Sequence, residues 1–197
     1  MPRTPKSVAS SNGRLDSKNW IEGALVQLAD HGIDGVRIEV LARALGVTKG
    51  SFYWHFKDRD ALLEAMLQTW RRKSTLQLME RLGQGSVSPI QRLDSLLKFP
   101  FASPNSRLGA DVELAIRLWG RHDPRARSAL AEIDELRMGF IKSIFVDLGM
   151  TQKSAEARAA LVYGFMRVGA SLPVEQPSVA LCDEIGTALA RTCTRTN

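Results

Sequence analysis

Side chains that could recognise nucleic acid are concentrated in residues 46–62, GVTKGSFYWHFKDRDAL. The cation of Lys49 and the hydroxyls of Ser51 and Tyr53 can donate hydrogen bonds to base edges or to phosphate oxygens. Gly50 would let the backbone come close to a duplex, and the flat ring of Tyr53 suits thymine methyl groups. This order of residue types is typical of a short helix that contacts DNA.

Apolar periodicity and capping residues predict the helices that must position this stretch. After a candidate N-cap at Asp16 or Ser17, apolar residues recur at helical spacing until Gly32, which predicts a first helix. The segment IEVLARAL predicts a short second helix, and Thr48 is a candidate side-chain N-cap for a third helix that runs to about His55. Two short helices joined by a tight turn that contains glycine are typical of a helix-turn-helix.

Phe52 and Phe56 are predicted to hold the third helix in place. Because they are four residues apart, they share one face and could pack against Leu41, Leu45 and the first helix. The opposite face of the third helix would then be free to enter a major groove.

The rest of the chain is also predicted to be helical, so the expected fold class is all-α with about nine or ten helices. Asp58 is a candidate N-cap for a long helix that reaches about residue 82, and the segment GQGSVSP marks a boundary after it. Further helices are predicted at 89–98, 107–121, 124–148, 152–172 and 178–193. The predicted organisation is a disordered basic arm at 1–15, a three-helix helix-turn-helix domain at 16–62 with the long helix as connector, and a C-terminal antiparallel helical bundle at 83–197.

The stretch IEVLARALGVTKGSFYWHFKDRDALLEAML resembles the TetR family of bacterial regulators. In that family a helix-turn-helix is followed by an aromatic pair, a His or Tyr, a Phe, and a basic residue that opens the next helix. The resemblance covers about residues 18–68, and the remainder is similar only in being a helical bundle of suitable length. It implies that one set of residues contacts DNA directly: Thr48, Lys49, Gly50, Ser51, Tyr53, Trp54 and His55. It also implies that Lys57 and Arg59 bind phosphate.

Each of these assignments has a structural alternative. Trp54 could be a packing residue, and His55 could cap or bridge locally. Lys57 and Arg59 could be solvated surface charges.

Arg37 is a departure from the family pattern. The family usually has Thr or Ser at this position, which caps the second helix and touches phosphate. Arg cannot accept the capping hydrogen bond, so Asp34 or solvent would take that role, while the guanidinium could still bind phosphate.

The bundle at 83–197 is predicted to bind a small-molecule effector and to form a homodimer. Candidate pocket residues are aromatic residues and methionines: Phe99, Phe101, Trp119, Met138, Tyr163 and Met166. Candidate dimer-interface residues are apolar or small and lie on two predicted helices: Ile144, Leu148, Ala160, Gly164 and Val168. Packing within one chain would explain both sets as well. Asp111 and Glu113 are predicted to form surface ion pairs with Arg117 and Arg121 at helical spacing. Because few charges are expected inside the bundle, an apolar or aromatic effector is favoured.

The composition argues against several other classes of protein. The chain has 197 residues with 44% hydrophobic and 24% charged residues, and no apolar run approaches the roughly 20 residues that span a bilayer. No secretory signal is recognisable, so a cytoplasmic protein is expected. No common catalytic motif and no zinc-ligand spacing is present, so no catalytic residue, metal or cofactor is expected. Cys182 and Cys193 would lie about 16 Å apart on one helix, too far for a disulfide.

Together with these patterns, the resemblance implies a TetR-like homodimeric repressor that binds double-stranded DNA at a palindromic operator and is released by its effector. Two alternatives stay open. One is a helical ligand-binding or enzymatic protein in which the helix-turn-helix is only a scaffold, which turnover of a substrate would favour. The other is a sequence-independent DNA-coating protein, which would show little preference for one sequence over random DNA.

Overall fold

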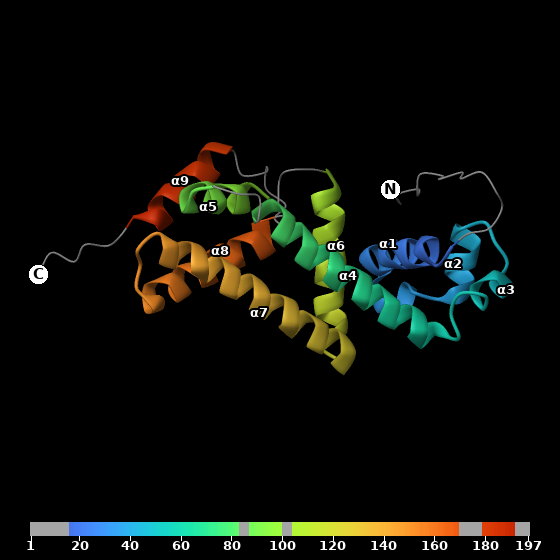
Figure 1. Ribbon diagram of the computed structural model, residues 1–197. Coiled ribbons are helices and arrows are strands. Elements are labelled where there is room, and N and C mark those ends of the chain that lie inside the picture. The colour runs from blue at the N-terminus through green and yellow to red at the C-terminus, as the bar shows by residue number, and fades with distance from the viewer. Residues whose placement is uncertain (1–15, 83–86, 100–103, 170–178, 192–197) are drawn as a thin grey trace, which may run out of the picture.

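The computed structural model describes residues 16–82, 87–99, 104–169 and 179–191, and within these ranges the chain forms nine helices and no strand (Figure 1). The helices are α1 (Ser17–Gly35), α2 (Ile38–Ala44), α3 (Lys49–Phe52), α4 (Arg59–Leu82), α5 (Pro89–Lys98), α6 (Pro104–Trp119), α7 (Pro124–Asp147), α8 (Gln152–Gly169) and α9 (Val179–Ala190). The predicted all-α class is confirmed.

The first helix begins and breaks where its sequence predicts. The Asp16 carboxylate accepts from the backbone N–H of Asn19, and the Asn19 side chain accepts from the backbone N–H of Asp16, both at 3.0 Å. This reciprocal pair satisfies donors that a helix N-terminus leaves open. At Gly32 the backbone has a φ of 68°, which interrupts the helical conformation before the chain continues to Gly35.

The turn between α2 and α3 depends on a glycine. Gly46 has a φ of 70°, a left-handed conformation that residues with a Cβ rarely adopt. The helix that follows is shorter than predicted, since α3 ends at Phe52 and a turn continues to His55. Thr48 is the N-cap residue by position, but its side chain makes no capping hydrogen bond, so that expectation was wrong.

The long helix α4 joins the two ends of the molecule. Asp58 accepts from the backbone N–H of Ala61 at 2.9 Å, which makes it the cap predicted from sequence. The 24 residues of α4 extend from the α1–α3 group into the bundle, a length of about 36 Å at 1.5 Å per residue (Figure 1).

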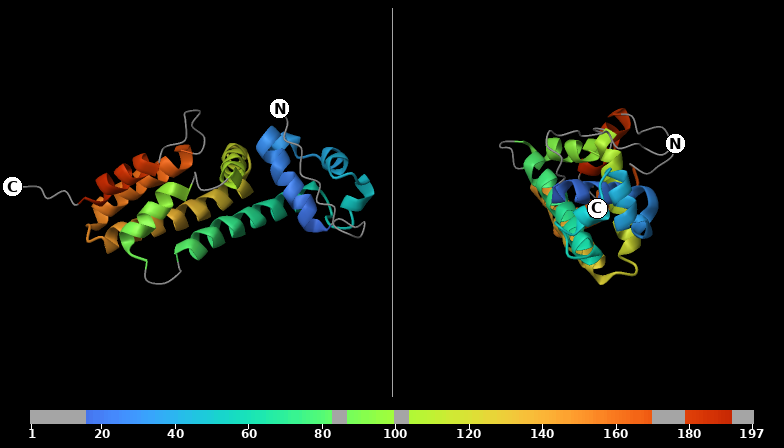
Figure 2. Two further views of the ribbon diagram at one scale, coloured as in Figure 1. Left: turned by 90° about the horizontal axis from the view of Figure 1, so that it is seen from above. Right: turned by 90° about the vertical axis from the view of Figure 1, so that its right-hand side faces the viewer.

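Two hydrophobic cores stabilise the structure, and they meet along α7. The first core joins α1–α4 to α6 and to the first half of α7, where Ala126, Leu130 and Ile133 are buried. The second core joins α5, α8 and α9 to the second half of α7, where Ile144 and Phe145 are buried. The molecule is accordingly elongated, with α1–α3 at one end and α5, α8 and α9 at the other (Figure 2).

The bundle helices follow the predicted ranges closely. α5 has the predicted bounds, α6 starts at Pro104 and ends at Trp119, and α7 ends one residue earlier than predicted. The predicted ends of the last two helices, at 172 and 193, lie outside the described residues. None of the helices in the described ranges is long and apolar enough to cross a membrane.

Candidate nucleic-acid interface

Phe52 anchors the short helix α3 to the first core. Its side chain is completely buried, and its ring meets the edge of the Trp20 ring at a centroid distance of 5.3 Å. The ring of Phe56 stacks on the Phe52 ring at a centroid distance of 5.4 Å. Such aromatic contacts stabilise beyond the burial of their area. The residues predicted to fix α3 are therefore packed behind it, and α1 sets its orientation.

The opposite face of α3 is exposed and carries the residues expected to touch DNA. Lys49 and Gly50 are exposed, and Ser51 is half-buried. Tyr53 and Trp54 are 53% and 79% exposed, although large aromatic side chains are usually buried. Exposed aromatic residues beside a cation mark a surface suited to a binding partner.

Gly50 is not required by the protein's own packing. A Cβ at this position would meet only the Thr48 hydroxyl oxygen, at an ordinary contact distance of 3.7 Å. Because alanine is the better helix former, a helical glycine with open space around it is unfavourable for the isolated fold. A partner that needs close access to the α3 backbone would explain the glycine.

Lys49 is held by an acidic residue that the sequence did not single out. Its Nζ donates to Glu39 Oε1 at 2.5 Å, and the two side chains are 51% and 60% exposed. The hydrogen bond raises the pKa of Lys49 and lowers the pKa of Glu39. The pair spans the turn between α2 and α3, so it is visible only once the two helices are placed.

Arg59 ties the start of α4 to the connection between α1 and α2. Its Nε donates to the Val36 carbonyl at 2.6 Å and its Nη2 donates to the Ile33 carbonyl at 2.8 Å. Two of its nitrogens are thus engaged within the protein. Lys57, two residues earlier, is exposed, and His55 is half-buried.

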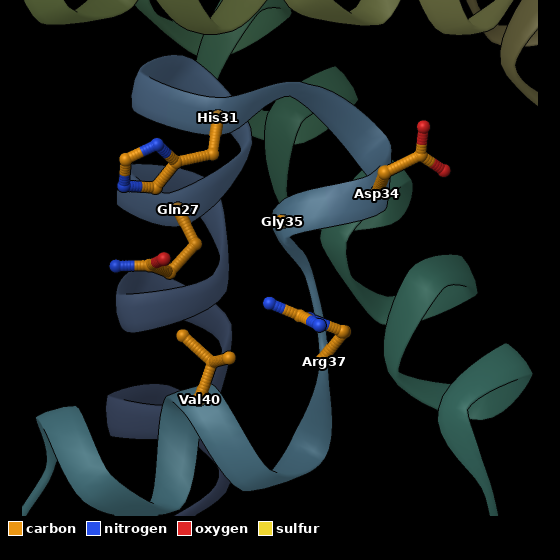
Figure 3. Close-up of a pocket in the computed structure, with 6 residues that line it drawn as sticks. All are labelled: Gln27, His31, Asp34, Gly35, Arg37 and Val40. Atoms are coloured by element: carbon orange, nitrogen blue, oxygen red, sulfur yellow. The ribbon is translucent and has the colours of Figure 1, made fainter.

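Arg37 lies at the N-cap position of α2 and makes no capping hydrogen bond through its side chain. It borders a surface hollow of about 380 Å³ between α1 and α2, which Gln27, His31 and Val40 also line. Figure 3 shows the Arg37 side chain directed towards this hollow, while Asp34 points away from it. The exposed guanidinium adds positive charge beside the helix-turn-helix.

The structure brings together most of the predicted pocket residues but separates one of them. Trp119 is buried in the first core, and its indole N–H donates to Asp123 at 3.0 Å. The second core contains or contacts the others that are described: Phe99, Met138, Tyr163 and Met166. Phe101 lies outside the described residues.

The predicted dimer-interface residues fall into two groups. Ile144 is fully buried within the second core, and Leu148 packs against that core. Ala160 and Gly164 are exposed on α8, next to Leu161, which is 64% exposed. Val168 belongs to α8, but its side chain lies outside the described part of the structure.

No group of metal-binding side chains is found in the described ranges. Cys182 is buried and faces the Leu97 carbonyl at 3.8 Å, whereas Cys193 lies beyond the described residues.

Three helices with a buried aromatic anchor behind a short exposed helix define a helix-turn-helix protein. Residues 21–66 match the family model of the bacterial regulatory proteins of the tetR family. The matched residues are similar to this TetR family and make up about a quarter of the chain.

Known proteins resemble the two parts of the chain to different degrees. The tetracycline repressor protein class D of Escherichia coli is 42% identical over 53 residues, which are 27% of this chain and 24% of that protein. The chain thus matches about a quarter of this curated relative. A transcriptional regulator of Rhodococcus sp. Rha1 has a TM-score of 0.70 at 17% identity, with 89% of this chain and 94% of that chain covered. The multidrug binding protein EbrR, solved in complex with imidazole, has a TM-score of 0.59 at 17% identity, with 94% and 100% covered. At such identities these structures show a shared fold.

Proposed function

We propose that this protein is a TetR-like transcriptional repressor that binds a palindromic DNA operator as a homodimer and is released by a small-molecule effector. The observation that carries the proposal is the exposed face of α3, where Lys49, Gly50 and Tyr53 surround a helix that Phe52 holds from behind. Such a helix fits the major groove. The proposed role is regulatory and not enzymatic, and it places the protein in the cytoplasm with the DNA.

The contact residues would divide into two kinds. Base edges would be contacted from the first turn of α3 and the turn after it, by Lys49, Gly50, Ser51 and Tyr53, with Thr48, Trp54 and His55 at its border. Phosphates would be bound by Arg37, Lys57 and Arg59. The hydrogen bonds of Arg59 to the α1–α2 connection support a further, positioning role for that residue.

We propose that residues 16–62 contact DNA, that α4 continues to residue 82 as a connector, and that residues 83–197 bind the effector and dimerise. The exposed small residues Ala160 and Gly164 with Leu161 support α8 as an interface helix, since small side chains allow two helices to approach closely. The multidrug binding protein EbrR, which shares this fold, was solved in complex with imidazole, and this supports a small-molecule effector.

Coupling between the two ends would pass through α6 and the start of α7, because both are part of the first core. A polar chain reinforces this route. Asp123 accepts from the Trp119 indole at 3.0 Å and from Arg125 at 2.8 Å, and Arg125 Nη2 also donates to Asp60 at 3.2 Å. The hydrogen bond from Arg125 is the main reason that the pKa of Asp123 falls to about 2. The first turn of α4 is thus linked to the α6–α7 turn.

Selection of bound DNA from a random library, followed by footprinting, tests the proposal. A palindrome with half-sites about 34 Å apart, or a multiple of it, is expected to be protected by a dimer. A single asymmetric site held by a monomer would contradict it. At fixed salt, similar affinity for the selected and the random sequence would instead indicate a non-specific DNA-coating protein.

A further inference from the structure

Three arginines converge on one buried carboxylate at the junction of α6, α7 and α8. Glu113 keeps 8% of its side chain exposed and is the only charged residue in the described part of the chain that is buried. Its carboxylate accepts from Arg137 at 2.9 and 3.0 Å, from Arg117 at 3.0 Å, and also from Arg167. The ion pair with Arg117 that the sequence predicts is present, but it belongs to a buried group instead of a surface pair.

A second carboxylate and a tyrosine complete this group. We call it the Glu113 cluster: Glu113, Arg117, Asp134, Arg137, Tyr163 and Arg167. Asp134 accepts from Arg117 at 2.7 and 2.9 Å, and the Tyr163 hydroxyl donates to Asp134 and accepts from Arg117 at 3.0 Å. Three cations face two carboxylates, so the cluster has one positive charge in excess. The Nε of Arg167 is buried and has no acceptor in the described part of the structure.

Excess positive charge at a partly buried position favours the binding of an anion. Guanidinium groups pair with carboxylates through directed hydrogen bonds that are stronger away from bulk water. The side chains of Arg117, Arg137 and Arg167 are 33%, 13% and 21% exposed, so they are within reach of solvent. The Tyr163 ring lies 5.1 Å from the guanidinium carbon of Arg167 and offers a flat wall beside the cations.

We propose that the Glu113 cluster is the binding site of an aromatic carboxylate effector, whose carboxylate replaces that of Glu113 on Arg137 and Arg167. The proposal rests on the effector-controlled regulator proposed above and names the chemical class of its ligand. The proposed ligand has the aromatic character expected from the sequence, and it also carries one negative charge.

Displacement of Glu113 would reach the DNA-binding end through α6. The neighbouring residues Val112 and Ile116 are buried in the first core, and α6 packs along α1. A buried carboxylate that has lost two of its three cations is destabilised, so α6 would move to bring Glu113 towards water. That movement changes the packing of α1, which carries Trp20 and thereby positions Phe52 and α3.

Benzoate and its uncharged analogue benzamide are suitable probes for the full chain. Calorimetric titration is expected to show binding of benzoate and none of benzamide. The variants Arg137→Gln and Arg167→Gln should bind benzoate at least about tenfold more weakly, since each removes a charged donor. Arg92→Gln is a matched control, because Arg92 pairs with Asp147 at 2.5 Å and is 19% exposed but lies outside the cluster. Its affinity for benzoate should equal that of the wild type.

The variant Glu113→Gln separates a binding site from a purely structural cluster. Without the competing carboxylate, benzoate should bind at least about tenfold more tightly than to the wild type and should raise the Tm of the variant, and benzamide should do neither. If the cluster only stabilises the fold, Glu113→Gln should be destabilised and benzoate should not raise its Tm. Benzamide acting as well as benzoate, or benzoate binding neither protein, overturns the proposal.

Operator binding without any probe is measured separately by fluorescence anisotropy. Its absence would reject the regulatory function, while charge-dependent rescue of Glu113→Gln by benzoate would still establish the anion site. Operator binding that persists in a wild-type protein insensitive to benzoate, together with no rescue of Glu113→Gln, would reject the site and leave the regulatory function standing.

Discussion

The substitution Gly50→Ala tests whether α3 meets DNA through its backbone. The new methyl group would contact only the Thr48 hydroxyl oxygen at 3.7 Å, and the backbone of Gly50 has no positive φ. Nothing inside the protein resists the change. Because alanine is favoured over glycine in helices by up to about 1 kcal/mol, the free energy of unfolding should stay the same or rise by up to that amount.

The expected effect on DNA binding has the opposite sign. A methyl group between the α3 backbone and the duplex would separate them and weaken one or two hydrogen bonds to phosphate oxygens. Hydrogen bonds to charged groups contribute roughly 1.5–3 kcal/mol each. The loss of one such bond corresponds to roughly a 10- to 150-fold weaker operator affinity.

Urea unfolding measures the first quantity, and fluorescence anisotropy with the selected operator measures the second. Gly139→Ala is the matched control, since Gly139 is exposed on α7 and a Cβ there would have nothing within 4 Å. It should stabilise to a similar degree and leave operator affinity unchanged. If Gly50→Ala binds the operator as tightly as Gly139→Ala does, the proposed close approach of α3 to DNA is refuted.

Three further predictions follow from the described contacts. Glu39→Gln should release Lys49 and remove a negative charge next to the duplex. Affinity for all DNA sequences should therefore rise, and the salt dependence of that affinity should steepen by about one unit. Unchanged affinity in a salt titration would contradict this prediction. Arg59→Ala should lower the free energy of unfolding by about 2–4 kcal/mol, because two carbonyls lose a charged donor. Lys57→Ala should leave stability unchanged and weaken binding to all DNA sequences. Equal stability of the two variants in urea unfolding would contradict this difference. Burial alone would raise the pKa of Glu113, but the charges and hydrogen bonds of its arginine partners outweigh burial and lower it to about 2 from 4.5. A carboxylate whose pKa is lower in the folded than in the unfolded chain stabilises the folded state at pH values above its unfolded pKa. The free energy of unfolding should therefore fall by about 3 kcal/mol as the pH falls from about 5 to 2. In acid titrations of stability, Glu113→Gln should lack this pH-dependent component.

Local signals in the sequence predicted the elements that present α3. Asp16 and Asp58 are the expected caps, Gly46 makes the turn, and Phe52 is buried as its spacing requires. Each of these signals acts within one or two turns of helix, so residue order alone contains it. The helical content of the bundle follows from the same kind of local pattern.

Contacts between distant helices could not be predicted in this way. Arg59 also donates to carbonyls 23 and 26 residues earlier in the chain, a positioning role that the phosphate prediction did not include. Glu113 meets Arg137 and Arg167, which are 24 and 54 residues away. These contacts depend on how α6, α7 and α8 cross one another. The residue pattern within a single helix cannot predict how that helix crosses another.

The first hydrophobic core has a consequence for how this protein could be recombined with its relatives. Val112, Ile116 and Trp119 pack into the same buried core as α1 and α4, although they lie some 30 residues or more after the end of α4. A chimera joined at residue 82 would therefore pair a foreign α6 with this surface and leave holes or clashes between them. The module that we propose binds DNA is therefore packed against a helix distant in sequence, and a graft that keeps its stability is expected to need α6 as well.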